Sequence, residues 1–71
     1  MKNQFTAYVQ RDGEWFVAVC PEVPEANGQG LTKEECLGSL ASAIGLVFEE
    51  RRASARGEFR SDAEETLVAV G

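Results

Sequence analysis

The stretch that decides the fold is Phe5-Thr6-Ala7-Tyr8-Val9-Gln10-Arg11-Asp12-Gly13-Glu14-Trp15-Phe16-Val17-Ala18-Val19-Cys20. Apolar and polar residues alternate over residues 4–10, which is the period-two pattern of a half-buried strand. Asp-Gly within the turn 11–14 favours a hairpin, because both residues tolerate positive φ. A second strand follows over 14–20, with Trp15, Val17 and Val19 on one face and Phe16, Ala18 and Cys20 on the other. Because both faces are apolar, we expect this strand to be central, or to meet another subunit with its second face.

After the hairpin, Pro21 ends the ladder because it has no amide proton to donate. Residues 21–24 are expected to be an extended connector, since a residue that precedes proline is kept out of the helical region. Residues 26–30 predict a short third strand. Its glycines, Gly28 and Gly30, weaken it and suit an edge or a bulge.

A helix is predicted to begin after Thr32, an N-cap residue whose capping box is completed by Glu35 three positions later. Apolar residues then recur at three- and four-residue spacing, as in a helix that buries one face. They are Leu37, Leu40, Ala41, Ile44, Val47 and Phe48. Gly38 and Gly45 either allow another element to approach closely or are simply tolerated there.

Beyond Phe48 the apolar stripe stops. Residues 49–56 predict a solvated helical extension that Gly57 terminates, and the alternative is a helix that ends near Arg52. Residues 58–63 resemble a loop, and residues 66–70 predict a last strand that returns to the sheet.

These elements predict an α+β fold in the order β-β-β-α-β, a small sheet with one helix packed on one face. The length of 71 residues allows a single domain over residues 1–71. Nothing in the sequence covers the other face of the sheet, which would carry Thr6, Tyr8 and part of the second strand. The core of so short a chain is small, so we expect this face to meet a partner, and the protein to form a homodimer or tetramer.

The composition argues against catalysis and against nucleic acid. The chain has no His, which removes His nucleophiles, general bases and metal ligands. With 7 Lys+Arg against 12 Asp+Glu, the net charge of −5 disfavours phosphate backbones and favours a basic partner. No carboxylate lies between Phe5 and Gln10, where a two-metal nuclease would need one. We expect no enzyme activity, no cofactor and no metal, and assign structural or solvating roles to Glu34/Glu35, Glu49/Glu50 and Glu64/Glu65.

The two cysteines, Cys20 and Cys36, are too few for the disulfide framework of a small secreted domain. The chain does not open on an apolar leader, and no run approaches the ~18 apolar residues of a membrane span. We therefore expect a cytoplasmic protein with reduced, buried thiols and no membrane association.

Three aromatic residues of the hairpin, Tyr8, Trp15 and Phe16, would suit a stacking platform for single-stranded nucleic acid. The net charge of −5 and the scarcity of nearby cations favour core or interface packing instead.

Two separated motifs resemble the HicB-like antitoxin family. The first runs over residues 12–24 and reads Asp-Gly-Glu-Trp-Phe-Val-Ala-Val-Cys-Pro-Glu-Val-Pro. The second runs over residues 30–37 and reads Gly-Leu-Thr-Lys-Glu-Glu-Cys-Leu. The resemblance covers roughly residues 5–48.

This resemblance implies a fold like a partial ribonuclease H, without the nuclease carboxylates. It also implies a domain that binds a small, basic, RNA-cleaving HicA toxin, covers its active site, and assembles into dimers or tetramers. Members of the family usually add a C-terminal DNA-binding domain. We do not expect one within these 71 residues, and so expect no direct DNA binding.

The hypothesis that follows is a non-enzymatic interaction module that occludes a basic toxin by steric cover and acidic complementarity. The candidate partner-binding residues are Tyr8, Trp15, Phe16, Glu22 and Glu25. The alternative is an orphan homo-oligomeric domain that binds a small ligand between subunits. A third hypothesis, a residual nuclease, requires magnesium-dependent RNA cleavage, which we expect to be absent.

Overall fold

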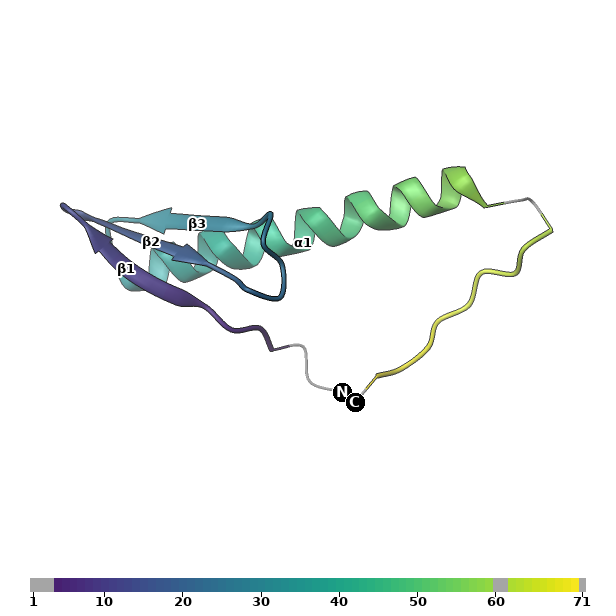
Figure 1. Ribbon diagram of the computed structural model, residues 1–71, viewed down its shortest axis with the longest axis horizontal. Coiled ribbons are helices and arrows are strands. Elements are labelled where there is room, and N and C mark those ends of the chain that lie inside the picture. Colours follow the sequence, from purple (N-terminus) through teal and green to yellow (C-terminus); the bar gives the residue numbers. More distant parts are fainter. Residues whose placement is uncertain (1–3, 60–61, 71) are drawn as a thin grey trace.

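The computed structural model describes residues 4–59 and 62–70 and shows a three-stranded sheet with one long helix (Figure 1). The strands β1 (Tyr8–Asp12), β2 (Trp15–Val19) and β3 (Asn27–Gly30) pair antiparallel in the order β1-β2-β3. The helix α1 (Lys33–Glu58) lies on one face of this sheet. The predicted α+β class, the central position of the second strand and the edge position of the third are therefore confirmed.

The hairpin between β1 and β2 is tighter than the sequence pattern predicts. Its ladder runs from the pair Tyr8↔Val19 to the pair Asp12↔Trp15, which leaves only two residues in the turn. Gly13 takes φ +64°, the left-handed conformation that glycine adopts without strain. The predicted limits were wrong here: the first strand is 8–12 rather than 4–10, and residues 4–7 belong to no strand.

The start of α1 confirms the predicted capping box. The Thr32 hydroxyl accepts a hydrogen bond from the Glu35 amide (3.1 Å), and the Glu35 carboxylate accepts one from the Thr32 amide (3.3 Å). The predicted solvated helical extension over residues 49–56 is confirmed, and the alternative end near Arg52 was wrong; the predicted stop at Gly57 falls one residue short of the last helical residue. The helix continues to Glu58, and Phe59 caps it through an N–H to Ala55 carbonyl bond of 3.1 Å. Glu, Arg and Ala dominate its last turns, and these are good helix formers.

The core lies between α1 and the two strands β2 and β3. It is built largely from small side chains, namely Ala18, Cys20, Val23, Ala26, Cys36, Leu40 and Ile44. Both cysteines are buried and free. Small residues suffice because the helix backbone approaches β3 directly. A Cβ added to Gly28 would lie 2.5 Å from the Cys36 carbonyl oxygen, and one added to Gly30 would lie 2.7 Å from the Cys36 amide nitrogen. The glycines of β3 therefore provide space for the helix.

The predicted last strand is not formed. The sheet ends at β1, and residues 64–70 have no regular secondary structure. The helix of 26 residues is about 39 Å long and continues well past the sheet, so that the chain turns back far from β1 (Figure 1). Leu37 and Ala41, which the spacing placed on the buried stripe, are exposed as a result.

Candidate partner-binding surface

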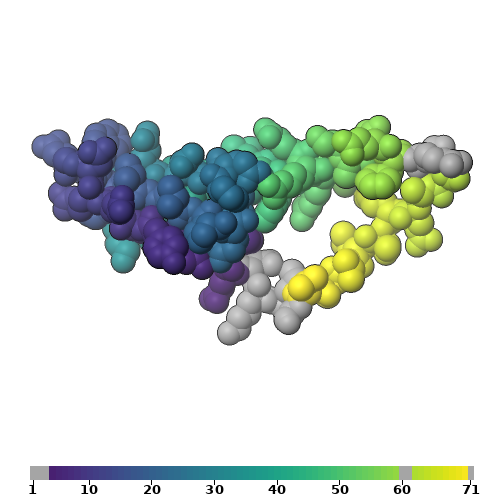
Figure 2. All heavy atoms as spheres, in the orientation of Figure 1, coloured from purple at the N-terminus to yellow at the C-terminus, as the bar shows by residue number. Residues whose placement is uncertain are grey.

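The face of the sheet opposite α1 carries exposed apolar side chains. Strand alternation and the register place Tyr8 opposite Val19, and Val17 between the amides Gln10 and Gln29. Tyr8 is 62% exposed, Trp15 47% and Val19 51%. Figure 2 shows the hairpin that carries them, in purple and blue, in front of the helix. We call this surface, made of Tyr8, Gln10, Asp12, Trp15, Val17, Val19, Asn27 and Gln29, the open sheet face.

None of the eight residues of the open sheet face carries a positive charge, and Asp12 adds a negative charge opposite Trp15. Of the described cations, Arg51, Arg52 and Arg56 lie in the second half of α1 and Lys33 lies at its start. Arg11 belongs to the helix-facing side of β1. The surface is therefore apolar to acidic.

Phe16 is not on this face. It lies on the helix-facing side of β2, half-buried against the core, where the Arg11 guanidinium stands 4.7 Å from its ring centroid. Such a contact is a cation–π interaction that fixes both side chains. Phe16 therefore supports the sheet from behind.

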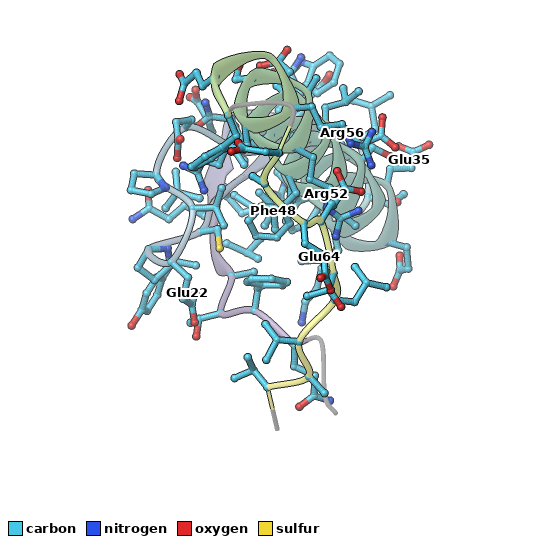
Figure 3. All side chains as sticks on the ribbon, turned by 90° about the vertical axis from the view of Figure 1, so that its right-hand side faces the viewer. Glu22, Glu35, Phe48, Arg52, Arg56 and Glu64 are labelled. Carbon is cyan, nitrogen blue, oxygen red and sulfur yellow. The ribbon has the colours of Figure 1, made fainter. Side chains whose placement is uncertain are left out.

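Glu22 is tied to the start of the chain. Its carboxylate accepts hydrogen bonds from the Thr6 amide (3.0 Å), the Thr6 hydroxyl (2.7 Å) and the Cys20 thiol (3.3 Å). The hydrogen bond from the Thr6 hydroxyl is the main reason that the pKa of Glu22 lies below its ordinary value. Figure 3 labels this residue, well separated from Glu35 and Arg56. Glu22 thus holds residues 4–7 against the connector between β2 and β3.

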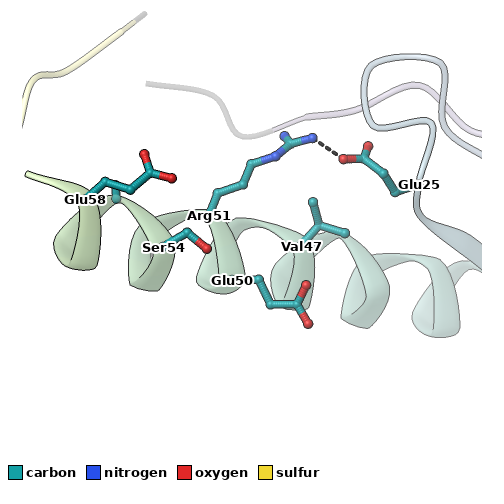
Figure 4. A pocket seen from close by; sticks show the side chains of 7 residues that line it. Glu25, Val47, Glu50, Arg51, Ser54 and Glu58 are labelled. Carbon is teal, nitrogen blue, oxygen red and sulfur yellow. Dashed lines mark hydrogen bonds and ion pairs between the residues drawn. The ribbon is translucent and has the colours of Figure 1, made fainter.

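Glu25, on the same connector, is paired with Arg51 of α1, as the dashed line in Figure 4 marks. A hydrogen bond from its own backbone amide, followed by the Arg51 guanidinium, lowers the pKa of Glu25. The pair borders an open hollow of about 420 Å³ whose wall includes Glu50 and Glu58. This pair therefore links the connector to the middle of the helix.

The five candidate residues thus occupy three places. Tyr8 and Trp15 share the open sheet face, Phe16 lies behind it, and Glu22 and Glu25 are engaged by partners within the chain. Their role in partner binding stays a prediction. The structure adds Val19 to the exposed apolar set, which the alternation of β2 had already grouped with Trp15.

A comparison with known proteins places the chain in a family. The UPF0150 protein ssl0738 of Synechocystis sp. is 44% identical to it over 71 residues, covering 96% of this chain and 97% of the relative. The chain belongs to the UPF0150 family. No family model matches its sequence, and no solved structure matches it.

This UPF0150 chain also has an apolar groove that the sequence did not indicate. The groove, of about 550 Å³, lies between residues 5–7 and the part of α1 from Leu37 to Arg52. Its lining is Phe5, Ala7, Leu37, Leu40, Ala41, Ile44, Gly45, Phe48 and Arg52. The rings of Phe5 and Phe48 lie 5.6 Å apart at 46° across it. Sequence reasoning missed the groove because it expected the last strand to return to the sheet.

Residues 4–59 and 62–70 of this UPF0150 chain contain neither a cluster of candidate metal ligands nor a helix that could span a membrane. No three His, Cys, Asp or Glu side chains in this part of the chain are grouped so as to hold a metal ion. No helix in the same residues is long and apolar enough to cross a membrane.

Proposed function

We propose that this UPF0150 chain is a non-enzymatic interaction module that resembles the toxin-neutralising domain of HicB antitoxins. In this proposal it binds a small, basic, RNA-cleaving toxin of the HicA type and covers the toxin's active site. The observation that carries the proposal is the open sheet face. Tyr8, Trp15 and Val19 are exposed there, and none of the eight residues that form this face is Lys or Arg.

Exposed aromatic residues on a sheet are suitable anchors for a protein partner. Trp and Tyr dominate binding hot spots, because each buries a large apolar area and keeps a polar group for a hydrogen bond. Trp15 lies on the central strand and Tyr8 on the strand beside it, so both backbones are already ordered. Little conformational entropy is lost when such side chains are covered, which supports binding by this face.

The electrostatics support a basic partner. The chain carries a net charge of −5, and the described arginines and lysine lie outside the open sheet face. A toxin with a basic active-site cleft would be attracted to this surface from a distance, which raises the association rate.

Glu22 and Glu25 have a supporting part in this proposal. Both are carboxylates and are ionised at neutral pH; Arg51 compensates the charge of Glu25, whereas Glu22 adds to the negative field. Each is held by a partner within the chain, Thr6 or Arg51, and so is fixed in position before a partner arrives. Direct contact with the toxin is assigned to the aromatic residues first.

The test is co-expression with a basic HicA-type toxin from the same genome, followed by titration calorimetry of the purified pair. Trp15→Gln is expected to weaken binding by about 2 kcal/mol, roughly 30-fold, as a hot-spot residue would. Leu46→Gln is the matched control, because Leu46 is 63% exposed on α1 and lies outside the open sheet face. Circular dichroism of both variants establishes that they fold.

Two results would contradict the proposal. One is that Trp15→Gln and Leu46→Gln weaken toxin binding equally, or that neither variant weakens it. The other is a chain that neutralises no toxin and purifies as a homo-oligomer with a small molecule bound, which would support the alternative of a ligand-binding orphan domain. Magnesium-dependent cleavage of RNA by the purified chain would overturn its non-enzymatic character.

A further inference from the structure

The outer edge of β3 directs backbone amides away from the sheet. β3 lies at one edge of the sheet. The turn between β1 and β2 has two residues, so the pair that closes it is hydrogen-bonded, and such pairs alternate along an antiparallel ladder. Followed across β2, this alternation directs the amides of Gly28 and Gly30 toward β2 and the amide of Gln29 outward. The amide of Leu31, which directly follows the strand, lies on the outward side as well. Outward amides of this kind can pair with another strand.

The sequence of β3 offers little protection against such pairing. Sheets usually block an exposed edge with Lys, with proline or with a bulge. β3 reads Asn-Gly-Gln-Gly and pairs one-to-one with β2, so it has no charge, no proline and no bulge. A strand with two glycines also holds its pairing register weakly. Beyond the short length of the strand, protection of this edge must therefore come from another element.

Two side chains of α1 occupy the outward amides of this edge. The Gln29 amide donates to the Ser39 hydroxyl at 3.3 Å, and the Leu31 amide donates to the Glu35 carboxylate at 3.0 Å. α1 packs mainly on β3, and Figure 1 shows this strand beside the beginning of the helix. An N–H group that is already bonded is not free to bond an incoming strand. α1 therefore covers the outer edge of β3 as well as its inner face.

The spacing of helix and strand makes these two contacts a matched row. Glu35 and Ser39 are four residues apart, on the same side of α1, and differ by about 6 Å along its axis. The two amides that they cover are two residues apart, which is about 6.8 Å of strand. The row ends at Ala43, which carries no acceptor, and no described side chain accepts from the amide of Asn27 at the start of β3. Covered and uncovered amides therefore follow the side chains of one helix row.

The needs of the helix alone do not explain either contact. Serine is a poorer helix former than alanine, so Ser39 weakens α1 unless its bond to the strand offsets the cost. Glu35 completes the capping box through the Thr32 amide at 3.3 Å, whereas its shorter bond, to the Leu31 amide, lies outside the box. Both side chains therefore serve the edge of the strand.

We propose that Ser39 and Glu35 close the outer edge of β3 against strand addition, so that no other chain, a second copy included, extends the sheet there. Partners are then confined to other surfaces of the molecule, among them the open sheet face. Closure of this edge does not depend on toxin binding, and its test uses no toxin.

Hydrogen exchange of the full chain, resolved by NMR, tests whether Ser39 covers the strand. Ser39→Ala is expected to speed exchange of the Gln29 amide about fivefold, the effect of one hydrogen bond, and to leave the amides of Gly28 and Gly30 unchanged. Ser42→Ala is the matched control, because Ser42 is exposed in the same helix and accepts from no described strand amide. Both substitutions raise helix propensity equally. Equal exchange of the Gln29 amide in the two variants would overturn the proposal.

A second test asks whether the edge accepts a strand once it is opened. The opened variant combines Glu35→Ala with Ser39→Ala and uncovers both amides. The control variant combines Thr32→Ala with Ser42→Ala, which also weakens the capping box but keeps both amides covered. A spin label is attached through Asn27→Cys in each protein, since Asn27 lies in β3 on the open sheet face and the two native cysteines are buried.

The distance between labels on different chains is then measured by double electron–electron resonance. A strand of four residues is about 13 Å long, so two paired β3 edges place their labels within roughly 20 Å of each other. We expect this distance in the opened variant, and in neither the control variant nor the chain that carries the label alone. Its absence from the opened variant, or its presence in all three proteins, would overturn the proposal. Circular dichroism establishes that the variants fold, and if the opened variant does not, exchange of the Gln29 amide in Ser39→Ala decides.

Discussion

A methyl group added at Gly28 should destabilise the fold, because it would enter the backbone of the helix. The added Cβ lies 2.5 Å from the Cys36 carbonyl oxygen, 2.6 Å from the Leu40 amide nitrogen and 2.7 Å from the Leu40 Cβ. Favourable contacts between carbon atoms lie at roughly 3.5–4.0 Å, so α1 and β3 must separate by about 1 Å. Two of these three obstacles are backbone atoms, which a change of side-chain rotamer cannot move.

The magnitude follows from the size of the chain. Overpacking of this kind costs about 2–3 kcal/mol, the upper part of its usual range, because backbone must shift. A chain of 71 residues has a free energy of unfolding of roughly 4–10 kcal/mol. Gly28→Ala should therefore remove about a fifth or more of the stability and lower Tm by roughly 10–20 °C.

Urea unfolding followed by far-UV circular dichroism measures this effect. Gly38→Ala is the matched control, since Gly38 lies within α1 and a Cβ there meets nothing within 4 Å. Alanine is the better helix former, so Gly38→Ala should stabilise the protein by up to about 1 kcal/mol. If Gly28→Ala proved as stable as the unmodified protein, the direct packing of the helix on β3 would be refuted.

Three further predictions concern single hydrogen bonds or torsions. Because the folded-state pKa of Glu22 lies below its ordinary value of 4.5, its contribution to stability is complete above that pH and is lost as pH falls through the folded pKa. Glu22→Gln should therefore weaken the acid dependence of Tm and speed amide exchange at Thr6, and an unchanged profile would argue against the pair. Thr32→Ala should lower the free energy of unfolding by about 1 kcal/mol through loss of the N-cap, whereas Thr32→Ser should restore it. Gly13→Ala should lower the free energy of unfolding by about 1 kcal/mol, since Gly13 has φ +64° and residues with a Cβ are strained there. Equal unfolding midpoints for the variant and the unmodified protein would contradict that conformation.

Local patterns predicted the parts of the fold that depend on near neighbours. Gly13 encodes the hairpin turn, which it forms with Glu14 after Asp12 has ended β1, and Thr32 with Glu35 encodes the start of α1, because each signal acts across four residues or fewer. The end of the helix was harder to predict. Gly57 stands inside the last turn without a positive φ, so the composition of the preceding turns outweighed the glycine.

The candidate surface was predictable only in part. Tyr8 and Trp15 were assigned to one face by the alternation of the strands, and the register places them there. The engagement of Glu22 by Thr6 and of Glu25 by Arg51 joins positions 16 and 26 residues apart. No local sequence pattern predicts such pairs, because the partner of each carboxylate is distant in the sequence and is brought close only by the fold.

The sequence by itself determined the α+β class, the hairpin, the capping box and the acidic character, since these depend on local spacing and composition. Only the tertiary structure explains why β3 contains glycines: the backbone of α1 lies directly on this strand and leaves no room for a Cβ. The tertiary structure also decided the conformation of residues 66–70, which form no strand. Their pattern encodes a strand, but a strand needs an edge to pair with, and the length of α1 carries these residues away from β1.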